Sequence, residues 1–358
     1  MFVTVISTVL NEGESVRRLM DSLKAQTRQP DEVIIVDGGS RDNTVAVLNE
    51  YRRYLPLKVL VEPGANISRG RNVAVAAAAG DLFACADAGV WLERAWLECL
   101  LSPFELPSAA QAPRPADSVR PQAVAGFFVP DVTTPFEIAM GATVLPTLAE
   151  VNPATFLPSS RSVAFTRAAW QAAGGYPEWI DYCEDLIFDL RVRATCGPFG
   201  WAPRALAHFR PRGTLRAFFK QYYRYARGDG KADLWRKRHA IRYLTYLVGL
   251  PALLALSVWR GPLWLLALAG GFAAYCRTPY RRLLPYLPRL SAGDRLRAVL
   301  LVPAIRVAGD AAKMLGYPAG WVWRFRNRRR PEVHWQAPAA GGPPDAPPAE
   351  RQTTATQF

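Results

Sequence analysis

The sequence predicts an α/β domain with a mostly parallel central sheet, followed by a membrane-associated helical region. Two observations lead to this fold class. Apolar, β-branched segments alternate with segments of helical periodicity over the first 90 or so residues, and two long, nearly uncharged segments lie in the second half. Half of the 358 residues are apolar and only 21% are charged, which is typical of a folded protein and excludes a largely disordered one.

Short connections join the predicted strands and helices of the first part. Strands are expected over 2–10, 32–37, 57–61 and 82–86, and helices over 15–26, 42–51 and 68–79. A strand, a helix and a second strand with short joins form a unit whose strands run parallel. Further along, we expect a Pro/Ala/Ser-rich surface loop over 102–121, a strand over 152–165, a helix from 168 and another helix from 184.

Polar or glycine-rich residues follow three of the predicted strands. They are Asn11 and Glu12 after the first strand, Asp37 after the second, and Asp87 after the fourth. In a doubly wound sheet, ligands bind beyond the carboxyl ends of the strands. The sequence therefore predicts a ligand site where these three ends converge.

Charge is distributed unevenly along the chain. Residues 1–200 hold 17 basic and 23 acidic side chains, whereas residues 201–358 hold 27 basic and 7 acidic ones. The basic part surrounds the apolar segments 242–259 and 261–276, which favours an anionic membrane surface over nucleic acid as the partner.

The two apolar segments predict a helical hairpin in a membrane. Each approaches the length needed to cross a bilayer, and basic residues crowd both outer flanks, which places both flanks on the cytoplasmic side. The alternative is a pair of helices in a soluble core, although such helices seldom lack charge on every face. Residues 297–323 have the pattern of an interfacial helix.

These patterns divide the chain into three predicted parts. We expect an α/β domain over 1–230, the membrane hairpin and interfacial helices over 231–330, and a disordered Pro/Ala/Gly-rich tail over 331–358. The five scattered cysteines form no Cys-x-x-Cys pair and predict reduced thiols, and the first residues lack the basic start of a signal peptide.

A series of motifs resembles the family-2 glycosyltransferases of the GT-A fold. The series begins with a strand followed by Asn11-Glu12 and continues with Val36-Asp37-Gly-Gly-Ser40-x-Asp42-x-Thr44, and the resemblance extends over residues 3–230. It implies transfer of a sugar from a nucleotide-diphosphate sugar. It also implies a nucleotide pocket lined by Thr8, Asn11, Glu12, Asp37, Gly38, Arg71 and Asp87.

Elementary chemistry is consistent with parts of that pocket. The carboxylate of Asp37 is able to accept the ring N–H of uracil or guanine, and Gly38 allows the backbone to approach closely. For Arg71, the alternative is a solvated charge at the start of a helix.

The metal motif departs from the family pattern. Cys85-Ala86-Asp87 stands where the family usually has Asp-x-Asp, so Asp87 is the single carboxylate available. Mg²⁺ or Mn²⁺ is still expected, because such ions are commonly held through substrate phosphates. The resemblance offers His208 as a second ligand, and the alternative is a purely structural histidine.

Two further motifs are similar to catalytic motifs of the family. Glu184-Asp185 resembles an acidic pair in which the aspartate is the general base, whereas two capping charges at a helix start are the alternative. Gln221, Arg224 and Tyr225 resemble a Gln-x-x-Arg-Trp motif that contacts the diphosphate and the acceptor, with an amphipathic membrane-facing helix as the alternative.

These patterns and the resemblance together predict a metal-dependent, inverting glycosyltransferase at the cell membrane. Its catalytic domain faces the cytoplasm, and its acceptor is lipid-linked or a polysaccharide. Two alternatives are a polyprenyl-phosphate glycosyltransferase and a catalytically inactive basic membrane scaffold. The sequence does not predict which sugar and which nucleotide base the donor carries, which molecule of these classes is the acceptor, or the oligomeric state.

Overall fold

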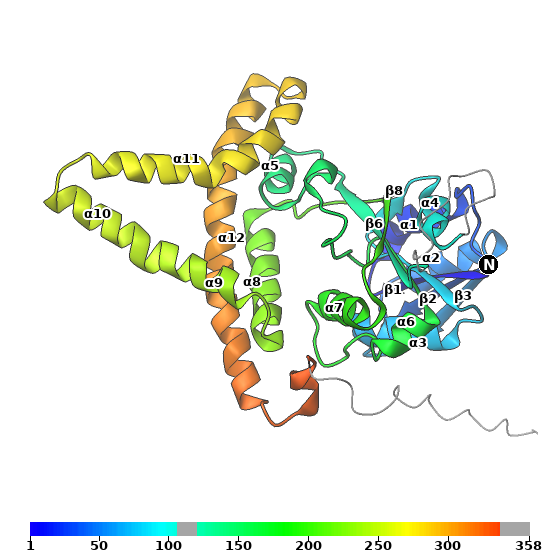
Figure 1. Cartoon of the computed structure of the whole chain (residues 1–358). Helices are drawn as coiled ribbons and strands as arrows, with labels where there is room; N and C mark the ends of the chain where they lie inside the picture. The colour runs from blue at the N-terminus through cyan, green and yellow to red at the C-terminus, as the bar shows by residue number, and fades with distance from the viewer. Residues whose placement is uncertain (106–119, 337–358) are drawn as a thin grey trace, which may run out of the picture.

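The computed structural model describes residues 1–105 and 120–336, which form an α/β domain joined to a group of long helices (Figure 1). The domain contains one eight-stranded sheet in the order β3-β2-β1-β4-β7-β6-β8-β5. Its strands are β1 (Val3–Val9), β2 (Glu32–Asp37), β3 (Leu57–Val61), β4 (Leu82–Cys85), β5 (Val90–Leu92), β6 (Ala123–Pro130), β7 (Val163–Thr166) and β8 (Gly200–Phe209). The predicted loop over 102–121 falls mainly outside the described residues.

The predicted fold class is confirmed. Strands β3, β2, β1 and β4 run parallel, as do β6 and β8, while β7 and β5 are antiparallel to their neighbours. Helices connect the strands, as expected for βαβ units. They are α1 (Arg17–Lys24), α2 (Thr44–Glu50), α3 (Ile67–Ala77), α4 (Trp96–Leu101), α5 (Pro135–Val144), α6 (Arg167–Ala172) and α7 (Glu184–Cys196).

Two predicted elements are shorter in the structure. The strand expected over 152–165 begins only at Val163, because Pro153 and Pro158 interrupt it and proline cannot donate a ladder hydrogen bond. Helix α6 ends at Ala172, just before Gly174 and Gly175, which both have positive φ.

Alternating side chains of the central strands fill two cores, one on each face of the sheet. Val33 and Ile35 of β2 lie in one core, while Ile34 and Val36 lie in the other. Successive side chains of a strand point to opposite faces, so a continuous apolar run is required when both faces are covered. Hence β1 and β2 are held rigidly, and so are the loops that follow them.

The remaining helices pack beside the domain. They are α8 (Leu215–Ala232), α9 (Arg236–Tyr243), α10 (Leu250–Trp259), α11 (Trp264–Leu283) and α12 (Ala292–Arg326), with a π-helical turn (Leu244–Gly249) between α9 and α10. Helices α8 and α12 lie side by side (Figure 1). A Cβ atom at Gly316 would lie 2.2 Å from the carbonyl oxygen of Tyr223, and one at Gly320 would lie 2.2 Å from that of Arg227. Only glycine permits this contact between the two helix backbones.

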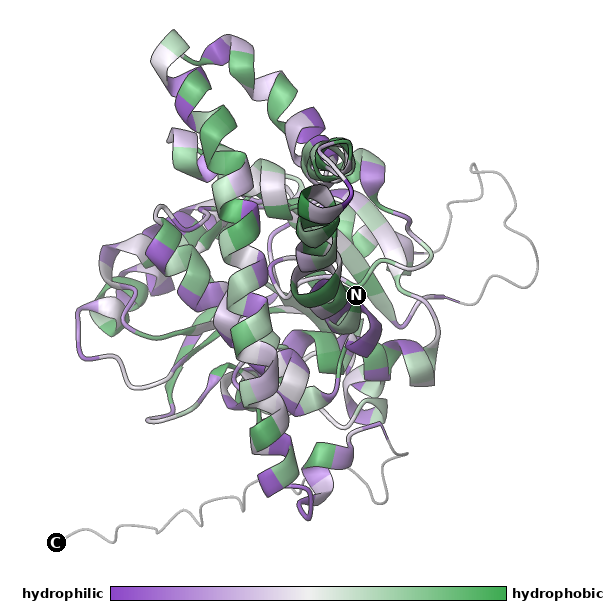
Figure 2. Cartoon of the chain, turned by 90° about the vertical axis from the view of Figure 1, so that its left-hand side faces the viewer, coloured by the Kyte–Doolittle hydropathy of each residue, from purple (hydrophilic) through white to green (hydrophobic). Residues whose placement is uncertain are grey.

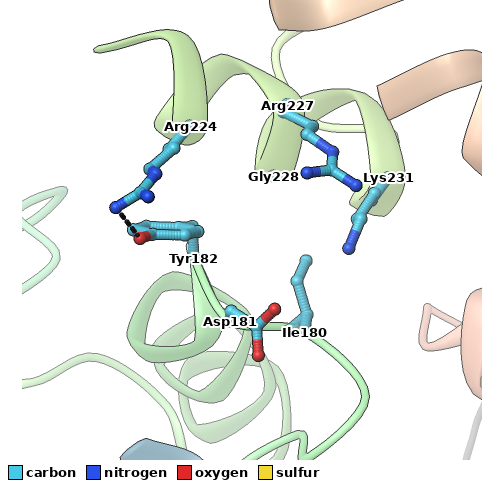
Figure 3. Close-up of a pocket in the computed structure, with 7 residues that line it drawn as sticks. All are labelled: Ile180, Asp181, Tyr182, Arg224, Arg227, Gly228 and Lys231. Atoms are coloured by element: carbon cyan, nitrogen blue, oxygen red, sulfur yellow. Dashed lines mark hydrogen bonds between the residues drawn. The ribbon is translucent and has the colours of Figure 1, made fainter. Parts of the chain in front are cut away.

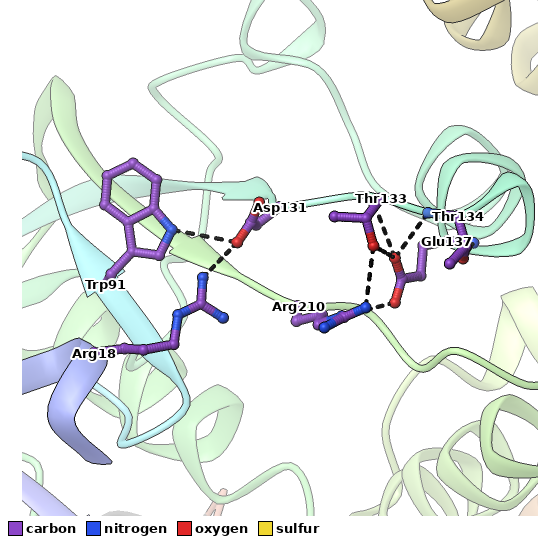
Figure 4. Close-up of polar contacts among 7 residues, drawn as sticks. All are labelled: Arg18, Trp91, Asp131, Thr133, Thr134, Glu137 and Arg210. Carbon is purple, nitrogen blue, oxygen red and sulfur yellow. Dashed lines mark hydrogen bonds and ion pairs between the residues drawn. The ribbon is translucent and has the colours of Figure 1, made fainter. Parts of the chain in front are cut away.

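Helix α5 joins the α/β domain to the helical group. Its apolar residues pack with Phe218 of α8 and with Val302 and Ile305 of α12. At its start, the carboxylate of Glu137 accepts hydrogen bonds from the Thr133 backbone N–H (2.9 Å) and the Arg210 guanidinium (2.9 Å), as Figure 4 shows. Burial alone would raise the pKa of Glu137, but these donors lower it to about 2. The connection between the two parts is therefore both apolar and ionic.

Helices α10 and α11 form the predicted hairpin and project away from α12 (Figure 1). The continuous helical stretch Arg236–Trp259 is 24 residues long, and its apolar part is not buried. Over 1–105 and 120–336, it is the single helix long and apolar enough to cross a membrane. Exposed apolar side chains continue into α11, including Leu265, Leu266 and Phe272. In Figure 2 the ribbon of the hairpin is coloured largely as hydrophobic.

The segment after Arg330 differs from the expected disordered tail. Pro331–His334 form a 3₁₀ turn, Val333 is buried, and the Trp335 indole N–H donates to the Ala232 carbonyl at 2.8 Å. Apolar burial against the end of α8 explains the order of these residues, and the sequence pattern did not separate them from the Pro-rich remainder. Residues 337–358 fall outside the described part of the chain.

The close contact of α8 and α12 generates a stability prediction. We expect Gly316→Val to lower the free energy of unfolding by at least about 1–3 kcal/mol, because the new side chain would overlap the Tyr223 carbonyl. Gly293→Ala in the same helix is the control, since its added methyl group meets no atom within 4 Å. Thermal unfolding of both full-length variants in detergent measures the difference, and equal stability would contradict this packing.

Candidate functional site

The loops after β1 and β2 form one connected structure at the carboxyl ends of the sheet. The Asn11 side chain accepts from the Arg41 backbone N–H (2.9 Å), and the Glu12 backbone N–H donates to the Thr44 hydroxyl (2.9 Å). Asn11 has a φ of 53°, in the left-handed region that asparagine tolerates. These contacts bring the predicted nucleotide-binding residues Asn11, Glu12 and Asp37 together.

Asp37 is buried and shapes the turn that follows it. Its carboxylate accepts hydrogen bonds from the backbone N–H groups of Gly39 (3.0 Å) and Ser40 (2.8 Å), and from the Ser40 hydroxyl. The contact of Asp37 with a nucleobase stays a prediction. A Cβ at Gly38 would lie 3.0 Å from the Ala65 carbonyl, so the missing side chain lets the two loops approach each other.

Helix α3 brings a buried arginine into this site. Asn66 caps the helix by accepting from the Arg69 N–H. Gly70 leaves room for Thr8 of β1, whose methyl carbon would lie 2.6 Å from an added Cβ. Arg71 follows and is only 3% exposed, so it is not a solvated helix-start charge.

The guanidinium of Arg71 bridges two carboxylates from distant segments. One nitrogen lies 2.9 Å from an Asp87 oxygen and another lies 3.1 Å from a Glu184 oxygen. The Tyr176 ring lies 5.1 Å from the guanidinium carbon. A buried cation requires such partners, because an unpaired charge in the interior is strongly destabilising. Arg71 therefore fixes the position of the loop after β4 relative to the start of α7.

Arg161 also faces Asp87 and was not identified from the sequence. Its Nε lies 3.9 Å from the second Asp87 oxygen, and its guanidinium carbon lies 4.4 Å from the centre of the Phe209 ring. Arg161 lies on the irregular segment before β7, where no local motif marks it. The segment was predicted to be a strand, and that prediction contained no feature that would have identified Arg161 as a site residue.

The predicted acidic pair occupies the first turn of α7. Glu184 is buried, and burial together with the neighbouring Asp185 raises its pKa to about 7, even though Arg71 opposes the shift. Asp185 is partly exposed. One turn later, burial also raises the pKa of Asp189 well above its ordinary value. Asp185 is thus the most accessible carboxylate of this group.

Cys183, which directly precedes the acidic pair, has a backbone conformation that few residues other than glycine adopt. Its φ of 69° lies in the left-handed region. Its sulfur approaches the Tyr225 carbonyl (3.4 Å), and a Cβ at Gly228 would lie 2.8 Å from that sulfur. The turn before α7 is therefore held against α8.

Helix α8 carries the predicted Gln221, Arg224 and Tyr225. The Gln221 amide donates to the Tyr225 hydroxyl (2.7 Å), and the Arg224 guanidinium donates to the Tyr182 hydroxyl (2.8 Å). Tyr182 precedes Asp185 by three residues. The structure therefore brings this motif next to the acidic pair, and their roles toward a diphosphate or an acceptor stay predictions.

The expected pairing of His208 with Asp87 is not seen. The His208 ring stacks on Trp91 with 3.8 Å between ring centres, and its Nε2 lies 3.0 Å from Glu93. Neighbouring residues of a strand point to opposite faces, and the next residue, Phe209, is the one that contacts Arg161. These contacts of His208 agree with the structural alternative, and its role as a metal ligand stays a prediction.

No preformed metal cage exists within residues 1–105 and 120–336, because no three acidic, histidine or cysteine side chains are grouped for one. Cys85, at the position of the missing carboxylate, is fully buried, and burial raises the pKa of its thiol to about 12. A neutral thiol is a poor ligand for Mg²⁺. Asp87 is the carboxylate that remains for a divalent ion, together with any phosphate oxygens of a bound donor.

The N-terminal third of the chain is similar to known glycosyltransferases. The model of "Glycosyl transferase family 2" matches residues 4–122. Glycosyltransferase AglE of Haloferax volcanii is 31% identical over 101 residues, which are 27% of this chain and 33% of that protein. The uncharacterized glycosyltransferase YibD of Escherichia coli is 34% identical over 87 residues, 24% of this chain and 25% of that protein. The matched region thus spans a third or less of each of these relatives.

One solved structure supports the fold over most of the chain. It is the mannosyltransferase PcManGT from Pyrobaculum calidifontis in complex with GDP-Man and Mn²⁺, with a TM-score of 0.56 and 18% identity. The similarity covers 87% of this chain and 86% of that one. Residues 4–122 thus match glycosyltransferase family 2, and they lie in a domain whose sheet is GT-A-like.

Proposed function

We propose that this protein is an inverting glycosyltransferase that moves a sugar from a nucleotide-diphosphate sugar to a lipid-linked or polysaccharide acceptor at the cytoplasmic face of the membrane. One observation carries the proposal. Arg71 joins Asp87, at the end of β4, to Glu184, which lies beside Asp185 at the start of α7. Donor-side and acceptor-side groups thereby meet beyond the carboxyl ends of the sheet, where ligands of such folds bind.

The donor is proposed to bind over the loops after β1 and β2. Thr8, Glu12, Asp37 and Gly38 lie at these ends, and Arg71 and Arg161 supply positive charge next to Asp87. A departing nucleoside diphosphate gains negative charge, which preorganised cations stabilise. The complex of the similar mannosyltransferase with GDP-Man supports a nucleotide-sugar donor.

Asp185 is proposed to be the general base. It lies at the start of α7, is partly exposed, and has a buried carboxyl on either side of it in Glu184 and Asp189. Removal of a proton from the acceptor hydroxyl lets its oxygen attack the anomeric carbon opposite the departing diphosphate. The C–O bond to the diphosphate breaks as the new C–O bond forms, so one displacement inverts the configuration.

A divalent ion, Mg²⁺ or Mn²⁺, is proposed to depend on Asp87 and on the phosphates of the donor. Mg²⁺ is usually held by one or two carboxylates and substrate phosphates. Asp87 would supply the carboxylate, and its oxygens also face Arg71 and Arg161. Such an ion would neutralise charge on the diphosphate. Mn²⁺ in the similar mannosyltransferase supports this choice of ion.

Membrane attachment is proposed to occur through the hairpin of α10 and α11. The exposed apolar surface of Arg236–Trp259 supports it, as do the exposed cations Arg236, Lys237 and Arg238 at its start. Basic residues at the base of such a helix favour the cytoplasmic side and an anionic surface. An acceptor held in the membrane would thus reach the active site from this side.

Two alternatives remain. A polyprenyl-phosphate glycosyltransferase would use the same donor site but an acceptor phosphate in place of a hydroxyl. An inactive membrane scaffold would bind anionic lipid without chemistry, and the intact carboxylates Asp37, Asp87 and Asp185 argue against it. Hydrolysis of a panel of nucleotide-sugars by the detergent-solubilised protein, with and without Mn²⁺, separates enzyme from scaffold.

Replacing the proposed base should separate binding from chemistry. We expect Asp185→Asn to lower turnover about 10²–10⁴-fold, because the amide keeps the shape of the side chain but cannot accept the proton. Nucleotide-sugar affinity should stay near that of the unaltered protein. The exposed Glu105→Gln is the control. Near-normal transfer by Asp185→Asn would rule out this base.

Removing the proposed metal carboxylate should abolish the effect of the ion on binding. We expect Asp87→Ala to lose Mn²⁺-dependent affinity for nucleoside diphosphate, because buried Cys85 cannot replace the missing carboxylate. His208→Gln should keep the dependence, since His208 contacts Trp91 and Glu93 instead. Titration calorimetry measures both, and unchanged Mn²⁺ dependence in Asp87→Ala would refute the assignment.

A further inference from the structure

A pocket of about 300 Å³ lies between α8 and the turn that leads into α7. One wall is formed by Asp181 and Tyr182 of the turn, and the other by Arg224, Arg227 and Lys231 of α8 (Figure 3). The three cations are spaced three and four residues apart, so they lie on one face of the helix. The volume is at the lower end of the range for small-molecule sites.

These three cations lack acidic partners. Within the described ranges 1–105 and 120–336, no carboxylate oxygen lies within 4.0 Å of the charged nitrogens of Arg224, Arg227 or Lys231, although nearby Arg236 pairs with Asp233. Asp181, the one carboxylate in the pocket lining, forms no ion pair in those ranges either. Three cations against one carboxylate leave an excess of positive charge, which matches a phosphate group.

The surroundings hold the pocket in shape. A Cβ at Gly228 would lie 2.7 Å from the Tyr182 carbonyl, so the turn rests directly on α8. The Lys231 ammonium lies 4.6 Å from the centre of the Trp323 ring, and burial and the nearby Arg227 lower the pKa of Lys231. An anion in the pocket would relieve the repulsion between these two cations.

The position of the pocket relates it to both the active site and the membrane helix. Tyr182 and Arg224 belong to the pocket wall, and they lie three residues before Asp185 and one before Tyr225, respectively. At its other end, Lys231 precedes the exposed basic start of Arg236–Trp259 by five residues. Along α8, the pocket therefore lies between the residues that contact the acidic pair and the start of the apolar helix.

We propose that Arg227, Lys231 and Arg224 bind a phosphate group of the acceptor, so that the acceptor is phosphate-bearing and its hydroxyl is presented to Asp185. This inference rests on the proposed glycosyl transfer. A lipid-linked phosphate and a water-soluble phosphorylated acceptor share this chemistry. The side chain of Arg227 is exposed and those of Lys231 and Arg224 are partly so, which leaves them accessible to either source.

The first test measures binding of inorganic pyrophosphate to the full-length protein in EDTA, where no divalent ion can recruit phosphate to Asp87. We expect the double variant Arg227→Gln/Lys231→Gln to bind at least about tenfold more weakly, because each hydrogen bond to a charged group contributes about tenfold or more. Lys220→Gln is the control: it removes an exposed cation of α8 outside the pocket and should bind as the unaltered protein does. Equal binding by the double variant, or no binding by the unaltered protein, would overturn the proposal.

The second test identifies the source of the phosphate. We measure binding of the unaltered protein and of the double variant to phosphatidylcholine vesicles. The vesicles contain either polyprenyl diphosphate or an amount of phosphatidylglycerol that carries the same charge. Selective loss of polyprenyl diphosphate binding by the double variant supports a lipid-linked acceptor, whereas loss of pyrophosphate binding alone supports a soluble one. The pocket would not be a phosphate site if the double variant lost binding to both kinds of vesicle equally and still bound pyrophosphate as the unaltered protein does.

A separate measurement distinguishes this inference from the proposed function. Nucleotide-sugar hydrolysis is followed in the same variants, and we expect the double variant to hydrolyse its donor at the unaltered rate while its KM for a phosphate-bearing acceptor rises. A protein that binds pyrophosphate in the pocket but hydrolyses no nucleotide-sugar would refute the glycosyl transfer alone.

Discussion

The buried ion pairs of Arg71 are the interaction on which the rest of the active site depends. Three segments that are far apart in the sequence, α3, the loop after β4 and the start of α7, meet at one guanidinium that is 3% exposed. Its desolvation is offset only if both carboxylates stay in place. Asp87 and the acidic pair of α7 are therefore positioned relative to each other by contacts within the protein itself.

The helical region depends on a second constraint, which is the backbone contact between α8 and α12. Glycines at 316 and 320 allow that contact, and α8 carries both the Gln221–Tyr225 motif and the cations of the pocket. Helix α12 thereby supports the acceptor side of the site without contributing to it directly. The contact of α8 with α12 therefore joins the helical group to the helix that carries the predicted Gln221–Tyr225 motif.

Much of the fold and part of the site were predictable from the sequence. Apolar runs on both faces of β1 and β2, with polar loops directly after them, indicated the sheet and placed Asp37 and Asp87 at its carboxyl ends. Local patterns failed where the structure depends on distant contacts. Arg161 lies on a segment without regular structure, and the direction of His208 depends on its register with Trp91 of β5. Order at Trp335 depends on a hydrogen bond to Ala232, a residue 103 positions away.

The proposed role of Arg71 is to hold Asp87 and Glu184 in the arrangement that binds a nucleoside diphosphate. The most direct measurement is the affinity of Arg71→Lys for nucleoside diphosphate with Mn²⁺, compared with Arg69→Lys, whose exposed side chain pairs with Glu62. Lysine keeps the charge but cannot bridge two carboxylates as the planar guanidinium does. We predict a loss of about tenfold or more for Arg71→Lys and none for Arg69→Lys. A folded Arg71→Lys protein with unaltered affinity would contradict the account.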